Sequence, residues 1–347
     1  MFVKDVKNVR PASQQRGHMT RTFQFLLLIV LAAQALVIGQ GPDAAKVLAD
    51  VRAALGGDDK LDAVKSVAVE GRLTKTTGGQ TLTNDFEMAF ELPDKFVKKE
   101  VIAVMGQMSI TRTTGFNGEG LIEVIDTPPQ MGGGMMITRM AGSGPPGMQA
   151  TPEQIARQRD ALLVLNKREF ARLSLGMFAA NPRAFPLEFA YAGEAEAPDG
   201  KAHVIDVKGA DGFSARLFVD TKTRLPLMLS WMDKEPMRMT MAGGTADGSG
   251  AVTVAHGHGV QMSGGRQVTP EQAEQLRQEM EQKIKEAEAN RRTVEYRIIY
   301  GDYKGVSGVQ MPTRIQRMID GQATEEWSLE KIKVNTKIDP RKFEVTK

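Results

Sequence analysis

Between Asp85 and Leu92 apolar and polar side chains alternate, and this pattern constrains the fold more than any other feature of the chain. Phe86, Met88 and Phe90 share the apolar phase with Leu92, whereas acidic residues dominate the other phase. A period of two is typical of a strand that has one face against a core and the other in water. The segment therefore predicts an antiparallel sheet with one buried face.

The same period recurs along most of the chain. Further strands are predicted over residues 67–73, 96–103, 108–113, 121–125, 187–191, 202–208, 215–220, 225–231, 294–303, 313–319 and 324–334. In the strand over residues 225–231, alternation predicts one shared face for Leu225, Leu227, Leu229 and Trp231.

The last predicted strand changes phase along its length. Trp327 and Leu329 lie in one phase, whereas Ile332 and Val334 lie in the other. A β-bulge near residues 330–331 explains the change, and a bulge also lets a strand curve around a barrel.

Three segments carry helix patterns. Residues 42–57 form an amphipathic pattern that ends at Gly56-Gly57, and Thr151-Pro152-Glu153-Gln154 has the composition of a capping box that starts a helix reaching about residue 175. The core-facing stripe of that second helix is predicted to be Ile155, Leu162, Leu163, Phe170 and Leu173. Residues 269–292 have a narrow apolar stripe and many charges, which predicts a solvated arm or a lid.

Two segments interrupt these patterns. Residues 127–150 and 242–268 are rich in Gly, and the first also in Pro, so both are expected to be mobile insertions in a single domain formed by residues 40–347. Their methionines either offer an adaptable apolar surface to a ligand or belong to disordered insertions in which they have no function.

Residues 1–39 have the layout of an export leader. Arg16 and Arg21 precede an uncharged apolar run from Phe23 to Gly39, with small residues at its far end. This layout indicates a cleaved signal peptide, and an uncleaved anchor in the inner membrane is the alternative. Either reading predicts that the remaining chain works in the periplasm.

The charge balance and the lack of cysteine exclude several classes of function. The leader holds five of the 45 Lys and Arg residues and one of the 42 Asp and Glu residues, so the remaining chain is nearly neutral. No nucleic-acid partner is therefore expected. With no cysteine, disulfides, thiolate metal sites and a cysteine nucleophile are excluded.

The sequence also lacks the motifs of hydrolases, metalloproteases and nucleotide-binding enzymes. We therefore predict that the protein is not an enzyme and has no cofactor. A copper site is a minor alternative, because thioethers and imidazoles suit copper. Its candidate ligands are Met237, Met239, Met241, His256, His258 and Met262.

With these strands and helices in place, the chain resembles the LolA/LolB-like family of periplasmic lipoprotein carriers. The segments that carry the resemblance are ALGGDDKLDAVKSVAVEGRL, FEMAFELPDKFVKKE, RLFVDTKTRLPLMLSW, YGDYKGVSGVQMPTRIQ and WSLEKIKVNTKIDPRKFEV. The resemblance implies an α+β fold in which a curved antiparallel sheet forms an unclosed barrel, with helices across the concave face and an apolar cavity for acyl groups. The two glycine-rich insertions and the charged helix depart from that family.

The first functional hypothesis is a carrier that binds a lipid or an acylated lipoprotein in the concavity. Its apolar lining is predicted to be Phe86, Met88, Phe90, Leu162, Phe170, Leu227, Leu229 and Trp231. The second hypothesis is an interaction or stress-sensor module on the same fold, in which residues 269–292 contact an envelope membrane protein.

Overall fold

The computed structural model describes residues 43–77, 80–103, 109–126, 135–136, 151–179, 185–198, 200–235, 253–255, 259–261 and 288–345, with isolated positions between 275 and 286. The leader, most of the two insertions and most of the charged helix therefore lie outside the described residues. No helix within the described ranges is both long and apolar enough to cross a membrane.

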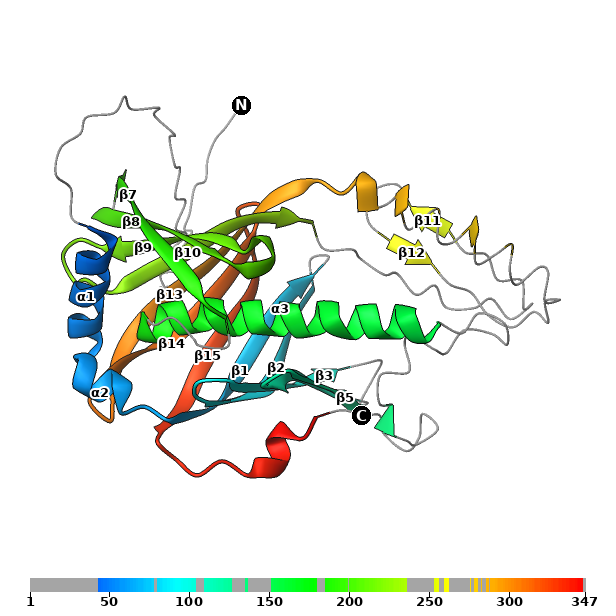
Figure 1. Cartoon of the computed structure of the whole chain (residues 1–347), viewed down its shortest axis with the longest axis horizontal. Helices are drawn as coiled ribbons and strands as arrows, with labels where there is room; N and C mark the ends of the chain where they lie inside the picture. Colours follow the sequence, from blue (N-terminus) through cyan, green and yellow to red (C-terminus); the bar gives the residue numbers. More distant parts are fainter. Residues whose placement is uncertain are drawn as a thin grey trace, which may run out of the picture. The chain divides into compact units, whose positions relative to one another are not determined.

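One 13-stranded antiparallel sheet forms the body of the protein (Figure 1). Its strands, in spatial order, are β6 (Met135–Met136), β5 (Gly120–Asp126), β4 (Ser109–Asn117), β3 (Lys95–Ala103), β2 (Gln80–Glu91), β1 (Ser66–Thr77), β15 (Gln322–Val334), β14 (Val309–Ile319), β13 (Thr293–Val306), β10 (Pro226–Lys234), β9 (Ser214–Asp220), β8 (Gly200–Gly209) and β7 (Leu187–Ala197). The terminal strands β6 and β7 do not pair with each other, so the sheet is not closed. A separate hairpin joins β11 (Thr253–Ala255) to β12 (Gly259–Gln261).

The α-helices between residues 44 and 178 pack on one face of this curved sheet. The long helix α3 (Pro152–Phe178) runs across the strands, and α1 (Ala44–Leu55) with the short α2 (Asp58–Asp62) lies at the end where α3 terminates (Figure 1). All three helices contribute to the same buried core as β1, β2 and β13–β15. The predicted fold, an unclosed curved sheet with helices on its concave face, is confirmed.

Local sequence signals explain where the helices begin and end. The Thr151 hydroxyl accepts the Gln154 N–H at 3.2 Å, and the Gln154 amide oxygen accepts the Thr151 N–H at 2.9 Å, which is the predicted capping box. Helix α1 ends at Gly56, whose φ of 138° places it outside the range that residues with a side chain adopt easily.

The predicted bulge in β15 is confirmed. Glu70 of β1 pairs with Lys331, but its neighbour Gly71 pairs with Leu329, so Glu330 is the extra residue. The phase change allows Trp327 and Ile332 to contact the same core on the concave side.

The C-terminal segment covers part of the opposite face of the sheet. After β15 the chain continues to the 3-10 helix η4 (Pro340–Phe343), and Ile338 and Phe343 form a second small core with Ala89, Val97 and Ile122. The Asn117 side chain donates to the Phe343 carbonyl at 3.1 Å. Both faces of the β1–β5 half are therefore partly covered.

Two predictions about which side chains face the core are wrong. Leu227 is the extra residue of a bulge between Pro226 and Met228, so it does not share the face of Leu229 and is 38% exposed. On α3, Ile155 is 36% exposed, because the buried surface of the helix lies mainly in its C-terminal half.

Candidate functional site

The concave face is lined by a compact aromatic cluster under α3. Phe90, Phe96 and Phe116 come from β2, β3 and β4, and Phe170 of α3 packs against all three with ring centroids 5.5–5.8 Å apart. All four side chains have no exposed surface. Such aromatic pairs stabilise beyond the area that they bury, so Phe170 anchors the helix on the sheet.

The predicted ligand lining lies in three different environments. Phe86, Met88, Phe90, Phe170 and Leu229 are at most 2% exposed and belong to one core. The remaining three are Trp231, which is half-buried against this core, Leu162, which is half-buried, and Leu227, which is exposed on its bulge. In this closed arrangement the fully buried residues pack against one another, and their role in ligand binding stays a prediction.

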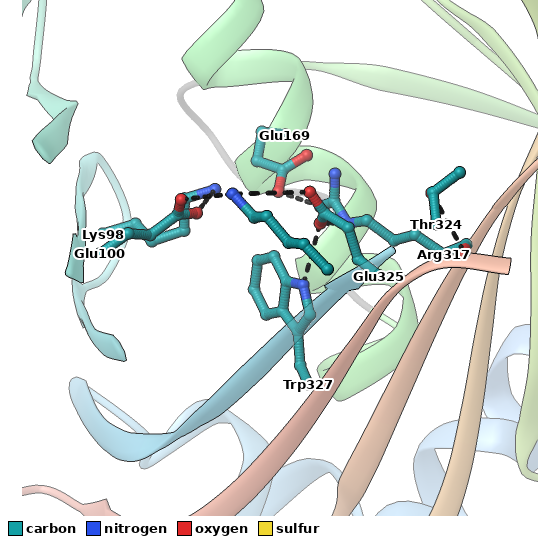
Figure 2. A network of polar contacts seen from close by, with 8 residues as sticks. Lys98, Glu100, Glu169, Arg317, Thr324, Glu325 and Trp327 are labelled. Carbon is teal, nitrogen blue, oxygen red and sulfur yellow. Dashed lines mark hydrogen bonds and ion pairs between the residues drawn. The ribbon is translucent and has the colours of Figure 1, made fainter. Parts of the chain in front are cut away.

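A buried polar network lies beside the aromatic cluster (Figure 2). Glu100 of β3, 7% exposed, accepts from Lys75 at 2.7 Å and from Lys98 at 2.8 Å. Burial alone would raise the pKa of the Glu100 carboxyl, but the two ammonium groups outweigh burial and hold it at about 2. Glu100 is therefore ionised at every physiological pH.

The network continues to α3 through Arg317 of β14. Arg317 donates to Glu169 of α3 and lies 3.6 Å from the carboxylate of Glu325, which also accepts the Trp327 indole N–H at 3.0 Å (Figure 2). The Arg317 guanidinium also lies 4.8 Å from the Trp327 ring centroid. Burial would raise the pKa of the Glu169 carboxyl, but the nearby cations Arg317, Lys98 and Arg172 together outweigh burial and lower that pKa. The Glu169–Arg317 pair therefore ties α3 to the sheet.

A second ion pair ties α3 to the β4–β5 turn. The Lys167 ammonium lies 2.6 Å from the Glu119 carboxylate. The Lys167 side chain is 11% exposed and that of Glu119 is 87% exposed, so this pair is half in water. Pairs of this kind contribute less than buried ones.

Two further guanidinium groups of α3 point toward the other half of the sheet. Arg172 is 9% exposed, and its guanidinium lies 3.9 Å from the Trp231 ring centroid and 5.4 Å from that of Phe213. Arg168, one turn earlier, donates to the Asp211 carbonyl between β8 and β9. Burial lowers the pKa of Arg172 to about 10, which leaves it charged at neutral pH.

This polar network was not predicted from the sequence. Carboxylates are mostly exposed in folded proteins, whereas Glu100 is buried and Glu169 lies against the sheet. One signal was present, because Phe96, Lys98 and Glu100 occupy one phase of the same strand and Phe96 is a core residue. The partners of Glu169 could not be found in this way, since Arg317 is 148 residues away.

A small pocket lies on the opposite face of the sheet. Its volume is about 140 Å³, and it is lined by Ala68, Ala89, Ile338 and several lysines near the C-terminal segment. A cavity of roughly 150 Å³ holds a molecule of the size of benzene. This pocket is therefore too small for a long acyl chain.

The predicted copper site and the predicted contact of residues 269–292 with a membrane protein concern other parts of the chain. No group of three or more His, Asp or Glu side chains within the described ranges could hold a metal ion. The six proposed copper ligands have no described side chains, and residues 269–287 are described only at isolated positions. Copper binding and contact with a membrane protein both stay predictions.

Comparison with known proteins gives structural matches only. No family model matches the chain, and no curated protein matches it. A DUF1329 family protein from Desulfovibrio piger is 11% identical, with a TM-score of 0.43 over 87% of this chain and 98% of its own. A LolA superfamily protein from Nitrosomonas europaea is 9% identical, with a TM-score of 0.42 over 88% of this chain and 98% of its own.

A third solved structure is an outer membrane lipoprotein-sorting protein domain from Vibrio parahaemolyticus. It is 8% identical, with a TM-score of 0.42 over 86% of this chain and 97% of its own.

Proposed function

We propose that the protein is an exported, non-enzymatic carrier that binds the acyl chains of a lipid or a lipoprotein in the bacterial envelope. The observation that supports this proposal is the apolar concave face of an unclosed sheet, covered by the long helix α3. Acyl chains would enter between α3 and the strands, where Phe86, Phe90 and Phe170 now pack together.

Burial provides the binding energy in this mechanism. Each methylene group moved from water to an apolar site contributes about 0.8 kcal/mol, so a long chain is held with few polar contacts. Met88, Met177 and Met311 are each 1% exposed in the core that α3 shares with the sheet. Their flexible thioethers can repack around ligands of different shape.

Helix α3 acts as the cover, and its polar ties set how easily it moves. Its C-terminal half is buried, whereas most of its first two turns are exposed. Displacing the helix breaks the Glu169–Arg317 and Lys167–Glu119 pairs and exposes apolar surface that a ligand can cover. The bound ligand thus replaces contacts that the helix makes in the closed form.

Native mass spectrometry of the protein purified from its own envelope tests the ligand class. We expect a phospholipid or an acylated peptide to co-purify and to be released by solvent extraction. A ligand-free mass, under conditions that keep a reference lipid carrier loaded, would contradict the proposal.

A reversible cross-link tests the role of α3. Because the chain has no cysteine, Glu119→Cys with Lys167→Cys gives one defined pair at positions whose side chains now meet at 2.6 Å. Bridging the pair with a cleavable bis-maleimide should abolish uptake of a fluorescent fatty acid, and cleaving the bridge should restore it. A protein bridged at the exposed positions 153 and 157 of α3 is the matched control.

A further inference from the structure

Arg172 is a buried cation without a hydrogen-bonded partner. Its side chain is 9% exposed, and its Nε is fully buried with no acceptor. The described contacts of its guanidinium are the aromatic rings of Trp231 and Phe213. A buried donor without an acceptor is destabilising. The charges of Glu169 and Asp233 favour the charged form of Arg172, but neither carboxylate is hydrogen-bonded to it.

Arg168 shares this deficit. Its Nε is also buried without an acceptor, and its one hydrogen bond goes to a backbone carbonyl, that of Asp211. Arg168 and Arg172 are four residues apart on α3, where like charges repel each other. Within the described residues, neither guanidinium is hydrogen-bonded to a carboxylate.

The nearby carboxylates are already engaged. Glu169 pairs with Arg317, and Asp233 accepts the Lys234 backbone N–H at 2.7 Å. Glu100 and Glu325 pair with other cations of the network. The five cations Lys75, Lys98, Arg168, Arg172 and Arg317 thus share four nearby carboxylates, those of Glu100, Glu169, Glu325 and Asp233.

We infer that Arg172, assisted by Arg168, binds the oxyanion of an anionic ligand at the edge of α3 that faces β10. The ligand class is an acyl lipid whose head carries a carboxylate or a phosphate, and this assignment rests on the proposed acyl-chain binding. Guanidinium groups present paired N–H donors that fit both oxyanions. The Trp231 ring, stacked on Tyr296 at 5.3 Å, holds the Arg172 guanidinium in place.

Of the three guanidinium nitrogens of Arg172, only Nε is fully buried without a partner. The two terminal nitrogens are therefore the ones that a ligand reaches first. The head group would then lie between α3 and the β8–β9 connection, at residues 210–213. The acyl chain would continue into the apolar core, where Leu229 lies two residues before Trp231 on β10.

The test compares laurate with methyl laurate, which keeps the chain and removes the charge. The full chain should bind laurate more tightly, by about tenfold or more, as expected for hydrogen bonds to a charged group. Arg172→Met should remove this preference by weakening laurate and leaving methyl laurate within about twofold. Arg216→Met, at an exposed arginine of β9 paired with Asp206, is the matched control and should retain the preference.

A second measurement uses inorganic phosphate without any lipid. Phosphate should raise the melting temperature of the wild-type protein, and Arg168→Met with Arg172→Met should reduce that shift. The wild-type preference for laurate over its methyl ester remains decisive even if a variant does not fold.

The outcomes separate this inference from the proposed function. If phosphate stabilises through Arg168 and Arg172 but neither laurate nor its ester binds, the anion site stands and the acyl carrier does not. If laurate and its ester bind equally and Arg172→Met changes neither, acyl binding stands and the anion site is overturned. If neither lipid binds and phosphate has no effect, both are overturned.

Discussion

Gly176 of α3 lies directly against the ring of Tyr300 of β13. A Cβ atom added to Gly176 would lie 2.1 Å from two carbons of that ring. The Tyr300 hydroxyl also donates to the Arg172 carbonyl at 2.8 Å, one turn earlier on the helix. The helix backbone therefore touches the sheet at this point, and only glycine permits that distance.

Gly176→Ala should destabilise the protein although alanine is the better helix former. Alanine in a helix gains roughly 1 kcal/mol over glycine, but the clash with a buried ring should cost about 3 kcal/mol. Urea unfolding of the single variants and of Gly176→Ala with Tyr300→Ala measures the coupling. In the Tyr300→Ala background the alanine should cost little, and an equal cost in both backgrounds would show that the ring is not the cause.

The strands could be predicted from the sequence because alternation is local. The strand over residues 85–92 and the bulge at Glu330 follow from the phase of a few neighbouring side chains. Alternation predicted the wrong face for Leu227, because a second bulge shifts the phase of the strand without a change in the apolar pattern. Periodicity therefore reveals a bulge only where the alternation of polar and apolar residues changes phase along the strand.

The polar network could not be predicted for a different physical reason. Glu169 and Arg317 meet only because α3 crosses β14, and nothing in their local sequences specifies that crossing. The unpaired state of Arg172 is likewise a property of the packed structure, since Glu169, three residues earlier, pairs with Arg317 instead. The sequence shows which charged residues could form ion pairs, but the partner of each one depends on the tertiary structure.

The network makes stability depend on acidity through Glu100. Because its folded pKa of about 2 lies below the ordinary value of 4.5, its contribution is complete above about pH 4.5 and is lost as the pH falls toward 2. A shift of this size corresponds to about 3 kcal/mol. Glu100→Gln should therefore lower the free energy of unfolding at pH 7 and flatten its decrease below pH 4.5.

Urea unfolding between pH 7 and pH 2 measures this effect. The control is Glu70→Gln, which removes an exposed carboxylate that lies 2.8 Å from Lys331. Exposed pairs contribute little, so the control should follow the wild-type pH profile. An unchanged profile for Glu100→Gln would exclude Glu100 as the source of the acid sensitivity.

Glu169→Gln should loosen α3 without unfolding the sheet. The change removes the charge that pairs with Arg317, which keeps Glu325 at 3.6 Å. Amide exchange should become faster along residues 163–178 and stay unchanged in β1 and β15. If α3 is the cover of the binding site, a fluorescent fatty acid should also bind faster. Glu153→Gln, in the exposed first turn of the same helix, should change neither rate.

Leu227 and Leu229 provide a matched test of which face of β10 contributes to the core. Leu229 has no exposed surface, whereas Leu227 on its bulge is 38% exposed. Leu229→Ala should cost about 2–5 kcal/mol of unfolding free energy, and Leu227→Ala should stay within about 0.5 kcal/mol. Fatty-acid binding by Leu227→Ala then tests whether Leu227 contacts the ligand. If the variant loses binding but keeps its stability, Leu227 belongs to the binding site. Unchanged binding would restrict the apolar lining on this strand to the buried face that Leu229 shares with Trp231.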